Sequence, residues 1–421
     1  MSGATEPPAT ASTWRRTELA VLTAVFLYFA GTSFVIPFLP LYVIELDHVD
    51  VATAAIWSGA ILGIAPLVSG FAAPFWGTLS DRYGHKLLLQ RSLIGFTVCL
   101  ALLAVASSSW QLLLIRVGTG LVGGFSVAAQ AMVSVGAPPR AITGAIGRTN
   151  AARVLGMAIG PLPGGLLADT IGVRGACTAA VAGGLVALLV VTFVAVAPAR
   201  GAVQHRARSV RRRLPWRADR LIGLVFSVTT VRLVEKSFDP VLPLFIAQLS
   251  GNPFGAGVTT AVVSSSGLLA AAFASSFTGG LGEQGVQRRG IVLAALLAAA
   301  ALLTVATYFA AAWWVVLIFR SIGGAALGVA GSLGVAEAAL RTDPKQHGRV
   351  MGVLGSGTAF GSAGGQIGAG LLAILSLPAV FLADAALLIG AAATVIPRRR
   401  SELLQRSEPP LRDHDDKERQ G

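Results

Sequence analysis

Long apolar segments alternate with short polar ones along the whole chain. Each apolar segment is about as long as a helix that crosses a bilayer, roughly 20 residues. The pattern predicts twelve such helices, six before a polar stretch and six after it: 17–44, 52–80, 88–106, 110–135, 147–169 and 174–197, then 221–249, 257–281, 291–309, 313–340, 348–373 and 378–397. The predicted fold class is an all-α membrane protein of two six-helix bundles.

The polar stretch at 198–220 divides the chain into halves. It holds eight arginines and one aspartate, which predicts a solvated basic linker on the cytoplasmic side. The predicted organisation follows from it: an N-terminal tail (1–16), a first bundle (17–197), the linker (198–220), a second bundle (221–397) and a C-terminal tail (398–421).

Composition supports this prediction. Of the 421 residues 54% are hydrophobic and only 13% are charged, whereas soluble domains carry roughly 25% charged residues. The net charge of +13 comes from the loops, so positive-inside topology explains it better than nucleic-acid binding.

Basic residues mark one side of the predicted membrane protein. They fall in the loops of that side and in both tails, whereas the alternate loops are nearly uncharged or acidic, as at Glu45, Asp47 and Asp50. Cytoplasmic loops are rich in Lys and Arg. We therefore expect a multi-pass protein of the cytoplasmic membrane with both termini in the cytoplasm.

The two halves repeat each other in three places. The segment 37–46 matches 240–249, the spacing from Trp110 to Arg116 matches that from Trp314 to Arg320, and 77–81 matches 279–283. The offsets of 203, 204 and 202 residues are nearly equal. Two bundles of six spans predict parallel repeats, a common architecture of membrane transporters.

Three motifs lie in the first half. A loop motif holds Gly77, Asp81, Arg82, Gly84 and Lys86, and the span 110–135 places Arg116 inside the membrane. The third motif comprises Gly147, Gly156, Gly160, Pro161, Gly164 and Gly165. Its glycines at 156, 160 and 164 share one helix face and permit close helix packing.

These motifs and the repeat resemble the major facilitator superfamily, specifically its twelve-helix drug:proton antiporters. The first two predicted spans look most like MdtG-type multidrug exporters. The resemblance implies that 77–86 forms a cytoplasmic gate, that Arg116 handles protons or substrate, and that 147–165 is the antiporter motif. His85 stands where the family usually has arginine.

The span 221–249 carries the densest intramembrane charge: Arg232, Glu235, Lys236 and Asp239. Charges are costly at that depth and are functional by default. We expect Asp239, with Glu235 second, to couple protons to transport. The alternative is a permanent ion-pair network, because both pairs have the i, i+3 spacing that allows pairing.

Other intramembrane charges are candidates of lower rank. They are Arg320, the repeat counterpart of Arg116, together with Asp384 and Glu337. Aromatic residues are expected to line a substrate cavity, although packing against neighbouring helices would explain them too: Phe34, Phe38, Tyr42 and Phe238.

The sequence thus predicts a monomeric secondary transporter that exports lipophilic or amphipathic small molecules in exchange for protons. The alternatives are an exporter of a sugar, metabolite or siderophore, or a non-transporting membrane receptor. We find no sequence signature of an enzyme, a nucleotide-binding loop, a cofactor or a metal site, and expect no nucleic-acid partner.

Overall fold

The computed structural model describes residues 11–138, 141–196, 219–249, 254–277, 286–342 and 347–396. Within these ranges the chain is helical, joined by short turns. The first half consists of α1 (Ala11–Val35), a 3₁₀ turn η1 (Ile36–Phe38), α2 (Leu39–Asp47), α3 (Val51–Tyr83), α4 (His85–Val105), α5 (Ser109–Leu121), α6 (Phe125–Gly136), α7 (Ile142–Ile159) and α8 (Pro161–Phe193).

The second half has longer, less interrupted elements. It consists of α9 (Asp219–Gln248), α10 (Ala256–Ser276), α11 (Val286–Tyr308), α12 (Trp313–Leu340), α13 (His347–Leu372) and α14 (Ala379–Val395). Each of these helices corresponds to one predicted span.

Eight stretches of the described chain are long and apolar enough to cross a membrane. One of them, 144–193, is 50 residues long and bends at Gly172, whose φ of 76° no ordinary helical residue adopts. It therefore provides two passes, and the bend lies between the predicted spans 147–169 and 174–197. With the charged α9, the glycine-rich α13 and the short α14, the helices account for twelve passes.

Three passes of the first half are broken helices. Pro37 falls in the 3₁₀ turn between α1 and α2, and Pro161 begins α8 directly after α7. A third break separates α5 from α6 at Gly124, which has a φ of 96°. Proline removes a backbone donor and glycine allows a left-handed residue, so the sequence explains each break.

The break between α5 and α6 leaves carbonyl groups that no helix satisfies. Trp76 Nε1 donates to the carbonyl of Leu121 at 2.8 Å, and the Arg91 guanidinium donates to those of Val122 and Gly123 at 2.7 Å each. The guanidinium also lies over the Trp76 ring, 3.3 Å from its centroid. Side chains of neighbouring helices thus satisfy the carbonyl groups that the break leaves unpaired. Inside a membrane such groups have no water to bond to.

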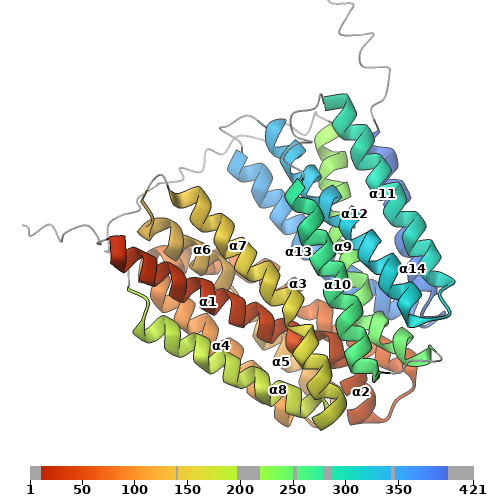
Figure 1. Cartoon of the computed structure of the whole chain (residues 1–421), viewed down its shortest axis with the longest axis horizontal. Helices are drawn as coiled ribbons and strands as arrows, with labels where there is room; N and C mark the ends of the chain where they lie inside the picture. The colour runs from red at the N-terminus through yellow and green to blue at the C-terminus, as the bar shows by residue number, and fades with distance from the viewer. Residues whose placement is uncertain are drawn as a thin grey trace, which may run out of the picture.

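Figure 1 shows the first half in red to yellow-green and the second half in green to blue, in contact at the end that carries α2. We call this the closed end. The halves touch along α3 with α13 and α8 with α10. At the closed end a Cβ atom on Gly59 would lie 2.6 Å from the Gln366 carbonyl oxygen, so α3 and α13 are in backbone contact there.

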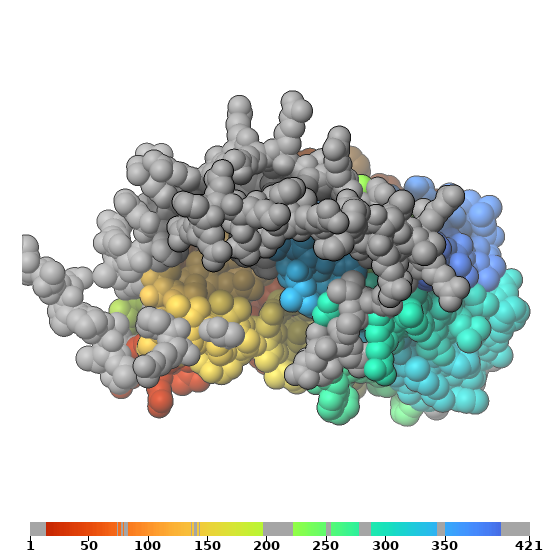
Figure 2. Space-filling view, turned by 90° about the horizontal axis from the view of Figure 1, so that it is seen from above, coloured from red at the N-terminus to blue at the C-terminus, as the bar shows by residue number. Residues whose placement is uncertain are grey.

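Toward the other end, which we call the open end, the halves diverge. The α3–α13 contact continues to the Phe71 and Phe360 rings, whose centroids are 5.5 Å apart. Beyond it the helices of the two halves move apart in Figure 1. Figure 2 views the molecule from the open end, with the first half on the left and the second half on the right.

Candidate transport site

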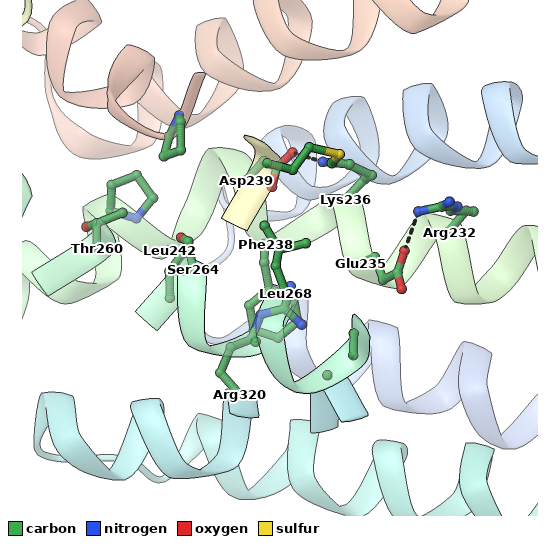
Figure 3. Close-up of a pocket in the computed structure, with 16 residues that line it drawn as sticks. Arg232, Glu235, Lys236, Phe238, Asp239, Leu242, Thr260, Ser264, Leu268 and Arg320 are labelled. Carbon is green, nitrogen blue, oxygen red and sulfur yellow. Dashed lines mark hydrogen bonds and ion pairs between the residues drawn. The ribbon is translucent and has the colours of Figure 1, made fainter. Parts of the chain in front are cut away.

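A cleft lies between the two halves, lined by residues of both (Figure 3). Its empty volume is about 650 Å³, including space open to solvent. Pro37 and Met157 line it from the first half, and α9, α10 and α12 supply the rest of its wall.

The four charges of α9 line this cleft as two ion pairs. Arg232 contacts Glu235 at 2.8 Å and Lys236 contacts Asp239 at 2.9 Å, both at the predicted i, i+3 spacing. Gln366 Nε2 from α13 also donates to Asp239, at 3.0 Å. The side chains are 21–39% exposed, so the pairs face the cleft and are not sealed in the helix packing.

Arg320 enters the same cleft from α12. Its guanidinium carbon lies 4.4 Å from the centroid of the Phe238 ring, and its buried Nε has no hydrogen-bond partner among the described residues. The Phe238 ring stacks on Phe381 of α14, with centroids 5.2 Å apart. A cation–π contact of this kind stabilises the guanidinium. No carboxylate of the described residues contacts it, so its positive charge has no partner in direct contact.

Behind this wall lies Asp384 of α14, which is only 3% exposed. Its carboxyl group forms a short hydrogen bond with the hydroxyl of Ser237, the residue before Phe238. The sequence marks Asp384 as an intramembrane charge. It does not identify Ser237 as its partner, because the two residues are far apart in the chain.

Arg116 does not join the α9 cluster. It is 7% exposed, its Nε donates to the Ile61 carbonyl at 3.3 Å, and it lines a separate, small pocket of the first half. The repeat-related arginines, Arg116 and Arg320, therefore occupy different cavities.

Glycines of the 147–165 motif pack against α1. A Cβ atom would lie 2.5 Å from the Phe26 carbonyl oxygen at Gly156, 2.5 Å from that of Ala30 at Gly160, and closer still to that of Phe34 at Gly164. Two further members differ: Gly165 faces the Gly257 carbonyl of α10, and Gly147 has no described atom within 4 Å of its Cβ position.

The predicted aromatic lining is present only in part. Phe238 lines the cleft. Phe38 and Tyr42 are fully buried, and the Tyr42 hydroxyl donates to the carbonyls of Leu103 and Ala106 at 3.2 and 3.3 Å. Phe34 contributes its backbone to the contact with Gly164 and is not among the residues that line the cleft. Helix packing, not a cavity, therefore accounts for Phe38 and Tyr42.

The loop motif spans the junction of α3 and α4. Gly77, Asp81 and Arg82 belong to the last turns of α3, and the side chains of Asp81 and Arg82 lie outside the described part of the structure. Gly84 has a φ of 94° and separates the two helices. Lys86 donates to the carbonyls of Thr192 and Ala195 at 3.0 and 2.6 Å, so it stabilises the C-terminal end of α8.

Two further buried carboxylates join helices at the open end. Glu337 is 2% exposed and contacts Arg289 of α11 at 2.7 Å and Arg341 at 2.6 Å. Glu18 of α1 pairs with Arg148 of α7. Both carboxylates form ion pairs with arginine, and each of them links two helices of the same half. Among the described residues, no group of three or more His, Cys, Asp or Glu side chains could hold a metal ion.

Comparison with known proteins agrees with this geometry. Residues 21–229 and 224–413 match the family model of the Major Facilitator Superfamily. The multidrug resistance protein MdtG of Proteus mirabilis (strain HI4320) is 34% identical over 278 residues, 65% of this chain and 68% of the relative. MdtG of Escherichia fergusonii is 33% identical over 276 residues, 64% of this chain and 67% of the relative.

Solved structures share the fold. The inward-facing, occupied form of a bacterial homolog of the human lysosomal transporter Spinster has a TM-score of 0.74 at 15% identity and covers 93% of this chain and 97% of its own. A mutant of the nucleoside transporter NupG has a TM-score of 0.74 at 13% identity, with 90% and 99% covered. The resemblance inferred from the motifs is therefore confirmed, and the chain belongs to the Major Facilitator Superfamily, a family of multi-pass membrane transporters.

Proposed function

We propose that this protein exports lipophilic or amphipathic small molecules across the cytoplasmic membrane in exchange for protons. The observation that carries the proposal is the cleft between the halves, where apolar walls surround two ion pairs and Arg320. A transported molecule needs apolar surface for affinity and a few polar groups for orientation. The multidrug resistance names of the MdtG relatives support the same substrate class.

The cycle that we propose is alternating access. α3 runs from the closed end to the open end, and α13 begins at the open end, so Lys86 at the start of α4 and Arg341 after α12 lie at the open end. By the positive-inside rule this end faces the cytoplasm, so the cleft is inward-facing. Export requires the open end to close and the closed end to separate. The closed end is held mainly by contacts between helices, and rigid-body rocking of two bundles can break such contacts as a unit.

The loop motif is proposed to act when the open end closes. Asp81 and Arg82 end α3 near the open end, which is where a cytoplasmic gate would form, and Lys86 already links α4 to α8. The glycine contacts between α7–α8 and α1 keep the first half compact while it moves. Each chain contains a complete cleft, so we propose that the monomer is the transporting unit.

For the charges of α9 the geometry favours the alternative named in the sequence analysis, a permanent ion-pair network, over proton coupling. Each carboxylate contacts a cation, and Asp239 also accepts a hydrogen bond from Gln366. We propose that these pairs orient the substrate within the cleft, and that the contacts within each pair persist through the cycle.

Transport in proteoliposomes tests the proposal. Purified protein is reconstituted with an imposed pH gradient, and uptake of ethidium and of 8-anilinonaphthalene-1-sulfonate, a cationic and an anionic amphipath, is followed by fluorescence. We expect gradient-dependent accumulation of at least one probe, abolished by a protonophore. A Gly164→Leu variant is the control for leak.

The alternatives give different results in the same vesicles. A sugar or metabolite exporter would ignore both probes but exchange radiolabelled sugars or organic acids. A receptor would move none of these solutes, and absence of all flux from correctly folded protein would contradict the proposal.

A further inference from the structure

Asp384 is a buried carboxyl group that no cation of the described chain contacts. It is the only charged residue of α14, and the helices packed against α14 are chiefly α9 and α11. Residues 290–307 of α11 and 350–372 of α13 contain no ionisable side chain. From α9 the residue that contacts Asp384 is the uncharged Ser237, and the charges of α9 line the cleft. Among the described charged groups, Arg320 of α12 interacts with Asp384 through space without contacting it.

The hydroxyl of Ser237 suits both protonation states of Asp384. It has two neighbours, the Val234 carbonyl at 2.9 Å and the Asp384 carboxyl group. A hydroxyl carries one hydrogen and can also accept. When Asp384 is ionised, Ser237 donates to it. When Asp384 is protonated, Ser237 accepts its proton in a hydrogen bond and donates to Val234 instead, so neither state leaves a buried polar group unpaired.

The carboxylates of α9 lack this property. Protonation of Glu235 or Asp239 would leave Arg232 or Lys236 without its partner inside the membrane region, which is costly. Protonation of Asp384 breaks no contacting ion pair among the described residues. Of the three carboxylates near the cleft, Asp384 is thus the one whose proton can come and go without disrupting the local structure.

A chain of contacts connects Asp384 to the cleft. Asp384 bonds Ser237, the adjacent Phe238 stacks on Phe381 of α14, and Arg320 lies over the cleft side of the Phe238 ring. Three cations of the described chain line the cleft, and Glu235, Asp239 and the nearby Asp384 balance them. One proton on Asp384 therefore leaves the cleft with one excess positive charge, carried by Arg320.

We propose that Asp384 is the proton-binding residue of the transport cycle, and that Arg320 transmits its state to the cleft. With Asp384 ionised the cleft accepts a cationic amphipath, and with Asp384 protonated the uncompensated Arg320 repels it. Proton and substrate then exclude each other, which is what antiport requires. This inference rests on the proposed function for its physiological meaning, but the proton site itself can be tested without transport.

The first experiment is infrared titration of the purified full-length protein. We expect the wild type to gain, on acidification, the carbonyl stretching band of a buried protonated carboxyl group. We expect Asp384→Asn to lose that band, Asp384→Glu to displace it, and Ser237→Ala to move its midpoint pH. Asp239→Asn is the comparison variant and should retain the band, because it leaves Asp384 and Ser237 in place. A band that none of the Asp384 and Ser237 variants alters would overturn the proposal, whether or not any substrate is transported.

The second experiment uses ethidium in proteoliposomes. Asp384→Asn carries no charge at this position and so resembles the protonated state. It is expected to lose both ethidium counterflow and gradient-driven accumulation, while it still binds the anionic 8-anilinonaphthalene-1-sulfonate, which the uncompensated Arg320 does not repel. Asp384→Glu restores part of the accumulation. Gradient-driven accumulation by Asp384→Asn at the wild-type level would refute the coupling role. If the wild type itself moves no ethidium, the proposed cationic substrate fails, and the infrared result still decides the proton site.

Discussion

Asp169 of α8 accepts a hydrogen bond from the backbone amide of Gly257 in α10, at 2.9 Å, across the boundary between the two halves. A second bond, from the Val258 amide at 2.8 Å, reaches its other carboxylate oxygen. A helix N-terminus has unpaired amide groups and a partial positive charge. Asp169 therefore caps a helix of the opposite half and helps to hold the closed end together.

Replacing Asp169 with alanine should shift the protein toward a state that is separated at the closed end. The contact is exposed, so its contribution is small, of order 1 kcal/mol or less, but this is enough to change a two-state population several-fold. Spin labels at the exposed positions 50 and 254 would report a longer distance in Asp169→Ala. Thr170→Ala is the control, because its hydroxyl bonds only to its own helix. Identical distance distributions in all three proteins would exclude the capping role.

The glycines facing α1 should tolerate no larger side chain. Gly160→Leu and Gly164→Leu are expected to abolish transport, because a Cβ atom already meets the α1 backbone at 2.5 Å from Gly160 and closer from Gly164. Gly147→Leu is the matched control from the same motif, since its Cβ would meet no described atom within 4 Å. Uptake rates, normalised to protein abundance, measure the effect. Equal loss in Gly147→Leu would mean that the motif acts by another route.

Removing Arg91 should destabilise the break between α5 and α6. Arg91→Leu leaves the Val122 and Gly123 carbonyls without a donor, and an unpaired buried group costs about 1–3 kcal/mol. We expect a lower unfolding temperature in detergent. Trp76→Phe, which removes one donor but keeps an aromatic ring, should give a smaller decrease. An Arg91→Leu protein as stable as wild type would show that water replaces the guanidinium.

The Lys236–Asp239 pair should affect substrate affinity more than proton coupling. Asp239→Asn leaves Lys236 without its charge partner, and we expect a higher KM for the transported probe with the gradient dependence retained. The double variant with Lys236→Gln should recover part of the loss, because it removes both charges. If Asp239→Asn abolishes coupling while Asp384→Asn retains it, the assignment of the proton site is reversed.

Membrane topology can be checked by reporter fusions. The arginine distribution predicts cytoplasmic signals after residues 16, 208 and 405, and external signals near 47 and 251. Positions 208, 251 and 405 lie outside the described residues, so the prediction rests on sequence alone. An external signal at 208 would contradict the twelve-span arrangement.

The lengths of the apolar segments predicted the twelve passes, because a bilayer requires a minimum helix length. They missed the break at Gly124, since one of 50 glycines is not distinctive until its φ is known. The ion pairs of α9 were predictable from i, i+3 spacing. Asp384 with Ser237 was not, because that pair joins residues 147 apart in the chain. The burial of Phe38 and Tyr42 was not predictable either. The same pattern of aromatic residues on a helix face occurs whether that face lines a cavity or packs against a neighbouring helix.

The contact between the two halves has a consequence for how the chain can be assembled. The described contacts run along α3 with α13 and α8 with α10, so the helices themselves recognise each other as two subunits of a heterodimer would. The linker that joins the two halves then mainly raises the effective concentration of one half near the other. The two halves, produced as separate polypeptides in one membrane, should therefore find each other and reconstitute the complete protein.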